Sequence, residues 1–242
     1  MACSLTLDEQ VADAVVHGSG AVDAAMRGRR SVRAFASMPV PQATVAAILD
    51  VAACAPSGTN TQPWQVIALA GNAKQALCER VLHAYHHEPG QHRPEYDIYP
   101  SEFVEPYLGR RRRNGFELYA LLGIAKGDKD AMHRQHARNF SFFDAPVGLI
   151  FTVDRRMTRS SWVDYGMFMQ NIMLAARARG LDTCPQMAWA LYPGILTEVL
   201  EIPDHQMVVC GMALGHADAN AAENRLKTGR EAVEGFARFS GF

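Results

Sequence analysis

A basic segment near the N-terminus has the composition of a phosphate-binding site. Residues 29–35 read R-R-S-V-R-A-F, which places three arginines and one serine hydroxyl within five residues. Guanidinium groups bind phosphate oxygens through charge-assisted hydrogen bonds, often two from one side chain. The segment therefore predicts a site for a terminal phosphate, although a solvated basic turn after a helix has the same pattern.

A second segment, residues 55–64, reads A-P-S-G-T-N-T-Q-P-W and has the composition of a ligand-facing loop. Pro56 and Gly58 shape its backbone. Its hydroxyl and amide side chains offer donors and acceptors that suit the polar edge of a planar heterocycle, namely Ser57, Thr59, Asn60 and Gln62. A helix C-cap followed by an ordinary turn explains the proline, serine and glycine but not the whole string.

Two shorter motifs complete the set. Residues 183–187, T-C-P-Q-M, end a predicted strand after a long helix, where backbone N–H groups often face a bound ligand. Residues 224–230, N-R-L-K-T-G-R, form a late basic element that we expect to fold back and complete the phosphate site. The alternative for this second motif is a solvated tail.

Several common cofactor and catalytic motifs are missing from the sequence. It has no G-x-G-x-x-G behind a strand, no G-x-x-x-x-G-K-[ST] and no G-x-S-x-G. Phosphate must therefore be held by side chains. Five histidines have partly helical spacings but no carboxylate or thiolate frames a metal site, so surface histidines are the favoured interpretation of His83, His86, His87, His133 and His136.

The elements that position these motifs alternate between helices and strands. Apolar spacing predicts helices at 7–26, 44–55, 73–85, 116–124, 129–139 and 160–179, and a small helix between the last two strands. Strands are predicted at 64–70, 147–153, 182–188 and 207–214. The helix at 160–179 is apolar on several faces, as expected if it packs on a sheet and on a partner. We expect one α/β or α+β domain over residues 1–242, with a lid-like excursion at about 86–113.

Composition excludes several other classes of protein. The chain has 242 residues, 48% of them apolar, which is enough for a packed core. Its 24 basic and 25 acidic residues balance, so no nucleic-acid partner is expected. Five scattered cysteines favour reduced thiols, and no segment has the length of a membrane span. We therefore expect a cytoplasmic protein with no membrane partner.

Taken in order, the motifs at 29–35, 55–64 and 224–230 resemble the FMN-binding nitroreductase family, over nearly the whole chain. The stretches Y-L-G-R-R-R-R-N-G-F-E-L-Y-A-L-L-G-I and R-N-F-S-F-F-D-A-P-V-G-L-I-F are similar to its nitrobenzoate-reductase branch. The resemblance implies an α+β fold with a central mixed sheet surrounded by helices. It also implies an intertwined homodimer with one FMN in each of two sites at the subunit interface.

The resemblance further implies which residues bind the cofactor. The FMN phosphate and ribityl chain would be held by Arg29, Arg30, Ser31, Arg33 and Arg230, with Lys227 as a weaker candidate. The opposite subunit would supply Pro56, Ser57, Gly58 and Asn60. The isoalloxazine would lie along Pro185, Gln186 and Met187, with a main-chain N–H near flavin N5 and Asn139 near the pyrimidine edge. Many relatives have an acidic residue in this last segment, whereas residues 183–187 have none.

The resemblance implies a ping-pong reaction in which NADH or NADPH is the transient reductant, FMN carries the chemistry, and nitrobenzoate-like nitroaromatics are reduced. Specificity would come from Thr59 and an aromatic roof of Tyr96, Tyr99, Phe103 and Tyr107. Arg110 and its neighbours up to Arg113 would attract a substrate carboxylate, or would simply solvate the start of a helix. Flavin, quinone or enone reduction, reductive dehalogenation and non-catalytic FMN binding remain as alternatives.

Overall fold

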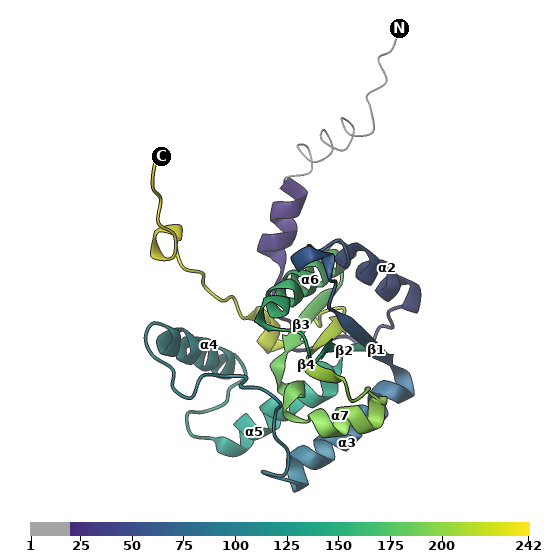
Figure 1. Ribbon diagram of the computed structural model, residues 1–242. Helices are drawn as coiled ribbons and strands as arrows, with labels where there is room; N and C mark the ends of the chain where they lie inside the picture. Colours follow the sequence, from purple (N-terminus) through teal and green to yellow (C-terminus); the bar gives the residue numbers. More distant parts are fainter. Residues whose placement is uncertain (1–19) are drawn as a thin grey trace.

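The structure is a computed structural model that describes residues 20–242 (Figure 1). After a helix at 20–28, the α-helices are α2 (Gln42–Ala52), α3 (Gly71–His87), α4 (Tyr107–Leu121), α5 (Lys129–Ala137), α6 (Arg159–Arg177) and α7 (Pro193–Leu200). The strands are β1 (Gln65–Ala70), β2 (Val147–Asp154), β3 (Asp182–Gln186) and β4 (Gln206–Gly215). Short 3₁₀ segments are η1 (Gly58–Asn60), η2 (Arg138–Asp144), η3 (Met187–Leu191), η4 (Ala222–Arg225) and η5 (Val233–Gly235). Residues 7–19 of the first predicted helix lie outside the described part.

The four strands form one sheet in the order β1-β2-β4-β3, and each neighbouring pair is antiparallel. The α+β class is confirmed. The expectation of a mixed sheet needs one correction, because the named strands pair only in antiparallel fashion. Within residues 20–242, parallel pairing is limited to an isolated bridge between Ser31 and Thr183. The Val32 N–H donates to the Thr183 carbonyl at 3.0 Å. The arginine-rich segment therefore runs along the outer edge of β3.

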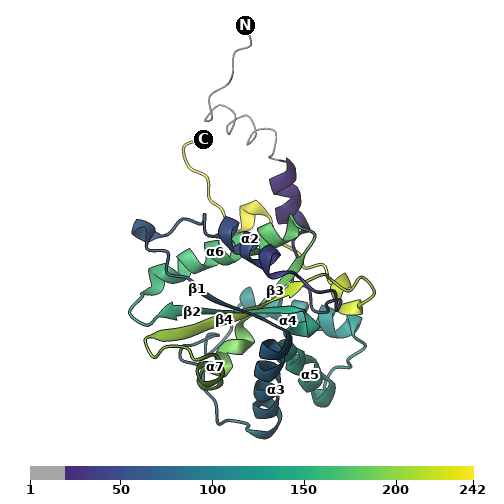
Figure 2. The same ribbon diagram turned by 90° about the vertical axis from the view of Figure 1, so that its right-hand side faces the viewer.

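Helices cover both faces of the sheet, and the side chains of β2 show why. Val147, Leu149, Phe151 and Val153 alternate onto one face, where they pack with α2 and α6. Ile150 points to the other face, into a cluster with α3, α7 and η2. Figure 2 shows α2 and α6 on one side of the sheet and α3, α5 and α7 on the other. The continuous apolar run of β2 is thus explained by burial on both faces.

Two glycines let the 3₁₀ segments approach the sheet closely. A Cβ added at Gly148 would lie 2.5 Å from the Phe142 ring, and one at Gly211 would collide with Trp189. Phe142 and Trp189 stack on each other with ring centroids 4.2 Å apart. This stack fixes η2 against η3, and these two segments carry residues predicted to contact the cofactor.

Several predicted boundaries differ from the structure, and two of them concern helices next to the cavities described below. The helix predicted at 116–124 begins at Tyr107, because its first turns are rich in arginine, a good helix former that gives no apolar spacing. The helix predicted to reach Asn139 ends at Ala137. There the chain enters η2, in which Phe142, Phe143 and Asp144 have left-handed φ values of 53°, 53° and 67°. Among the described residues, no helix has both the length and the apolar character needed to cross a membrane.

Candidate functional site

The predicted phosphate-binding residues come together around one cavity of about 840 Å³. We call it the arginine cavity; parts of residues 26–33 and 226–230 line it, with Asn114 of α4 and Arg177 of α6. It includes every predicted phosphate residue, namely Arg29, Arg30, Ser31, Arg33, Lys227 and Arg230. None of the described residues that line it is acidic. In this cavity the late basic motif lies beside the early one, as expected if the two share a ligand.

The buried side chain of Asn224 joins these two segments. Its Oδ1 accepts the Arg33 N–H at 2.9 Å, and its Nδ2 donates to the carbonyls of Ala34 and Asp218 at 2.7 and 2.9 Å. Its own carbonyl accepts a hydrogen bond from the Arg30 guanidinium at 2.8 Å. Asn224 is the first residue of the late basic motif, but no sequence pattern indicated this linking role.

The charges of the arginine cavity suit a dianion. Burial and the neighbouring Arg230 lower the pKa of Arg29, because both disfavour a second cation at this position. Within residues 20–242, Arg177 differs from the other lining cations because it pairs with an acidic residue, Asp182, at 3.2 Å. A bound phosphate would relieve the repulsion between the remaining guanidinium groups and accept hydrogen bonds from them. The cavity therefore fits the phosphate end of a nucleotide cofactor such as FMN.

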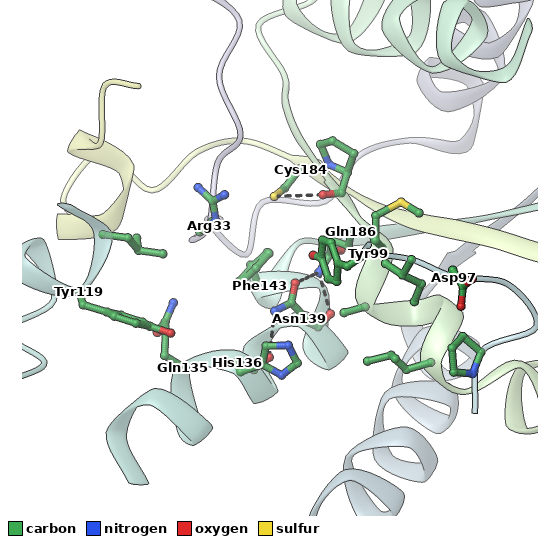
Figure 3. Close-up of a pocket in the computed structure, with 17 residues that line it drawn as sticks. Arg33, Asp97, Tyr99, Tyr119, Gln135, His136, Asn139, Phe143, Cys184 and Gln186 are labelled. Carbon is green, nitrogen blue, oxygen red and sulfur yellow. Dashed lines mark hydrogen bonds between the residues drawn. The ribbon is translucent and has the colours of Figure 1, made fainter. Parts of the chain in front are cut away.

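A second cavity, of about 530 Å³, adjoins the first at Arg33, which lines both. We call it the Gln186 cavity, and Figure 3 shows its polar side chains. It contains the four residues predicted to lie along the planar ring, namely Asn139, Pro185, Gln186 and Met187. The structure thus brings the phosphate motifs and the ring motif into one continuous region.

Gln186 carries the clearest sign of a missing partner in the Gln186 cavity. The side chain is 2% exposed, and its Nε2 donates to the carbonyl and the Oδ1 of Asn139 at 2.8 and 3.3 Å. Its Oε1 is buried and has no hydrogen-bond partner among the described residues. A buried carbonyl oxygen without a donor is costly, so a ligand N–H at this position would stabilise it. The ring system of FMN has such a group.

The edge of the sheet forms one wall of the Gln186 cavity. β3 is the outermost strand, and Pro185 has no N–H, as is typical of a strand edge that does not pair further. Cys184 also lines the cavity, but burial raises the pKa of its thiol to about 11. It is therefore a neutral thiol near pH 7 and does not supply a nucleophile.

The 56–60 loop is not part of either cavity. The Gly58 N–H donates to Asp164 Oδ1 at 3.2 Å, near the start of α6, whereas the arginine cavity reaches Arg177 at its end. The 13 residues from 164 to 177 span roughly 20 Å of helix at 1.5 Å per residue. Thr59 and Asn60 are exposed and have left-handed φ values of 49° and 57°. The loop therefore lies far from the arginine cavity of the same chain; its residues are Pro56, Ser57, Gly58, Thr59 and Asn60.

The predicted aromatic roof is divided. Tyr99 lines the Gln186 cavity and is 61% exposed. Tyr96 does not line it; its hydroxyl donates to the Val209 carbonyl, and its ring packs edge-on against Trp162 at 4.7 Å. Phe103 lies under the Arg111 guanidinium at 4.7 Å, outside the lining residues.

Tyr107 and Arg110 lie on the first turn of α4. Tyr107 is 59% exposed, and Arg110 forms an ion pair with Glu231 at 2.5 Å. Neither is among the described residues that line the Gln186 cavity. Its actual wall on this side includes four residues that were not predicted as site residues, namely Leu118, Tyr119, Gln135 and His136. Leu118 and Tyr119 lie in the stretch at 107–124 that is similar to the nitrobenzoate-reductase branch, and His136 lies three residues before Asn139. Only packing shows that these residues line the cavity.

Comparison with known proteins agrees with this geometry. The sequence profile of the nitroreductase family matches residues 26–216. The chain is 43% identical to a 4-nitrobenzoate reductase of Pseudomonas putida, over 91% of this chain and 96% of the relative. It is 44% identical to a chloronitrobenzene nitroreductase of Comamonas testosteroni, over 90% and 96%.

Two solved structures share the fold closely. One is an FMN- and NADPH-dependent nitroreductase, NfnB, from sphigopyxis sp. strain HMH, with a TM-score of 0.88, 39% identity, and coverage of 91% of this chain and 99% of that one. The other is the FMN-dependent NfnB of Mycobacterium smegmatis in complex with NADPH, with a TM-score of 0.87, 30% identity, and coverage of 92% and 99%. The predicted resemblance is thereby confirmed, and the chain belongs to the nitroreductase family.

Proposed function

We propose that the chain is an FMN-dependent oxidoreductase that uses NADH or NADPH to reduce nitroaromatic compounds, nitrobenzoates among them. The observation that carries the proposal is the junction of two cavities at Arg33. One cavity is cationic, and the other is lined by Gln186, whose buried Oε1 has no hydrogen-bond partner among the described residues. The names of the relatives support the substrate class, and those of the solved structures support the cofactor and the reductant.

In this proposal each cavity holds one end of the cofactor. The arginine cavity binds the phosphate through Arg29, Arg30, Ser31, Arg33 and Arg230, with Lys227 at its border. The Gln186 cavity receives the ring along Pro185, Gln186 and Met187, and Asn139 orients Gln186 by accepting from its Nε2. Bound FMN supplies the hydride chemistry, while the protein supplies orientation and a cationic environment.

We further propose a homodimer with the cofactor at the subunit interface. A second copy is needed to bring the loop of Pro56, Ser57, Gly58 and Asn60 to the ring, because α6 holds this loop away from the arginine cavity of its own chain. The C-terminal segment extends away from the rest of the chain in Figure 1. It carries three exposed phenylalanines, 72%, 66% and 105% exposed, which a partner would cover: Phe236, Phe239 and Phe242.

We propose that the chain is a single domain in which the segment at 86–113 acts as a lid. The substrate would enter over the ring, beneath this lid. Tyr99 is the roof residue that the geometry supports best, because it lines the Gln186 cavity. Thr59 would arrive with the partner's loop. Tyr96, Phe103 and Tyr107 would shape the lid from behind, and Arg110 is already neutralised by Glu231. Location in the cytoplasm stays a prediction.

An anaerobic titration tests the proposal. The purified chain should carry FMN, and its yellow absorbance should bleach with NADH or NADPH and return when nitrobenzoate is added. A flavin that neither nucleotide reduces would show non-catalytic binding instead. A panel containing free flavin, quinones, enones and halogenated aromatics separates nitro reduction from the other reactions of this scaffold. Absence of FMN binding would refute the proposal.

A further inference from the structure

His136 is a cavity residue that the assignment of the cofactor leaves unused. It lies at the end of α5 and lines the Gln186 cavity together with Asn139 and Tyr99. Figure 3 shows it beside Asn139, whose Nδ2 donates to the His136 carbonyl at 2.9 Å. A ligand that fills the cavity above Gln186 would therefore meet this imidazole.

Neighbouring aromatic groups hold the imidazole in one orientation. Its Nδ1 lies 3.2 Å from the Tyr85 hydroxyl, which also lies 3.2 Å from the His133 carbonyl. The Tyr85 ring stacks on the rings of His133 and His136 at 4.3 and 5.5 Å, and Phe140 packs edge-on against His136 at 5.8 Å. Because Nδ1 is engaged, Nε2 is the ring nitrogen left for a ligand.

The groups around His136 make its protonated form a comparatively strong acid. On α5 it faces His133, and on α3 it faces Tyr85, with His86 beyond them at 3.4 Å from His133. Across the cavity lie Arg33, Asp97 and Tyr119. His136 is exposed as a residue, but desolvation of its packed ring and the neighbouring His133 lower the pKa of His136, so its imidazolium form is a stronger acid than a free imidazolium.

We propose that His136 donates the proton that accompanies hydride transfer to the nitro group, and that Tyr85 positions it. The inference rests on the proposed function. Reduction to the nitroso compound is ArNO₂ + NAD(P)H + H⁺ → ArNO + NAD(P)⁺ + H₂O, and bound FMN would supply the hydride chemistry. One N–O bond breaks, and its oxygen leaves as water, carrying the hydride-derived hydrogen and the proton from His136. Solvent then returns the proton to Nε2.

The test separates the two half-reactions. Enzyme reduced anaerobically with dithionite is mixed with 4-nitrobenzoate in a stopped-flow instrument, for wild type, His136→Gln, Tyr85→Phe and the control His87→Gln. His87 belongs to the same histidine-rich region, but its ring nitrogen contacts the His83 carbonyl and it does not line the cavity. General acid catalysis contributes roughly 100-fold or more, so flavin reoxidation should slow by about that factor in His136→Gln.

The pH dependence and a spectroscopic measurement complete the design. Because the donor is the protonated imidazole and its pKa lies below the usual histidine value, wild-type reoxidation should slow as pH rises through that pKa. His136→Gln should lose this dependence, while its reduction by NAD(P)H and its FMN affinity stay at wild-type values. An NMR titration of the wild-type holoenzyme should show the His136 imidazole titrating below pH 6.5.

The following results would contradict the inference about His136. Equal reoxidation rates and pH profiles in wild type and His136→Gln would overturn it. Equal losses in both half-reactions, or a loss of FMN binding, would show a structural role instead. A wild-type reduced enzyme that no nitro compound reoxidises would refute the proposed function itself, which is distinguishable because the failure then appears without any substitution.

Discussion

Two loops with the same kind of sequence evidence behave differently in the structure. The arginine-rich segment at 29–33 meets the late basic motif within one chain, where Asn224 fastens them together. The loop at 56–60 is hydrogen-bonded to Asp164 at the opposite end of α6 and lines neither the arginine cavity nor the Gln186 cavity of its own chain. One chain therefore brings all the proposed phosphate residues together but leaves the proposed ring residues of this loop apart. In the homodimer that we propose, the cofactor site would be divided between the subunits at these two loops.

The largest effect on FMN affinity should follow from removing positive charge from the arginine cavity. The double substitution Arg29→Ala/Arg230→Ala deletes two cations of the arginine cavity. Each charge-assisted contact contributes about 1.5–3 kcal/mol, so FMN affinity should fall by roughly 100-fold or more, as measured by flavin fluorescence titration. Arg156→Ala is the matched control, because Arg156 is exposed, pairs with Asp154 and lines neither cavity. Unchanged FMN affinity in the double variant would place the phosphate elsewhere.

The next largest effect is expected when two defective variants are mixed, which tests whether the two loops of one site come from different subunits. Arg29→Ala/Arg230→Ala homodimers lack the phosphate site, and Ser57→Ala/Asn60→Ala homodimers lack polar groups of the loop. In a mixed dimer one site collects both defects and the other has none, so refolded mixtures should regain nitroreductase activity that neither parent shows. No recovery, with mixed dimers demonstrated by mass spectrometry, would mean that both loops serve the same site from one chain.

Replacing Asn224, which links the two basic motifs, should have an intermediate effect on stability and on FMN affinity. Asn224→Ala leaves the Arg33 N–H without its partner and removes one of the two hydrogen bonds that the carbonyls of Ala34 and Asp218 each accept. A buried group left unsatisfied costs about 1–3 kcal/mol, so urea unfolding should show a loss of stability together with weaker FMN binding. Asn224→Asp, which keeps the acceptor and loses both donors, should retain part of the stability. Wild-type stability in Asn224→Ala would show that the loops are positioned independently.

The smallest effect is expected on the lid side. Arg110 and Glu231 form an ion pair whose side chains are 48% and 46% exposed, and such pairs contribute only about 0–1 kcal/mol. Arg110→Ala should therefore change thermal stability little and leave KM for 4-nitrobenzoate nearly unchanged. A large rise in KM with nitrobenzoate but not with nitrobenzene would instead show that Arg110 leaves Glu231 to bind the substrate carboxylate.

The sequence by itself determined the local features. Charge density marked the two basic motifs, continuous hydrophobicity marked β2, and the helix at 160–179 was found within two residues of α6 because its apolar pattern is long. These features depend on neighbours in the sequence, which is why they could be read from it. Local patterns did not assign Asn139 and Gln186 to the flavin ring; that assignment came from the family resemblance.

Tertiary structure alone decided the rest. The left-handed turn at 142–144 depends on Phe142 stacking on Trp189. Both rings pack against glycines of β2 and β4, two strands that are neighbours in the sheet but far apart in the sequence, and no local propensity encodes that arrangement. The approach of His136 to Gln186, the turning of Tyr96 away from the cavity and the separation of the 56–60 loop from the arginines likewise depend on contacts between remote segments. A sequence fixes which groups are available, whereas packing fixes which of them meet.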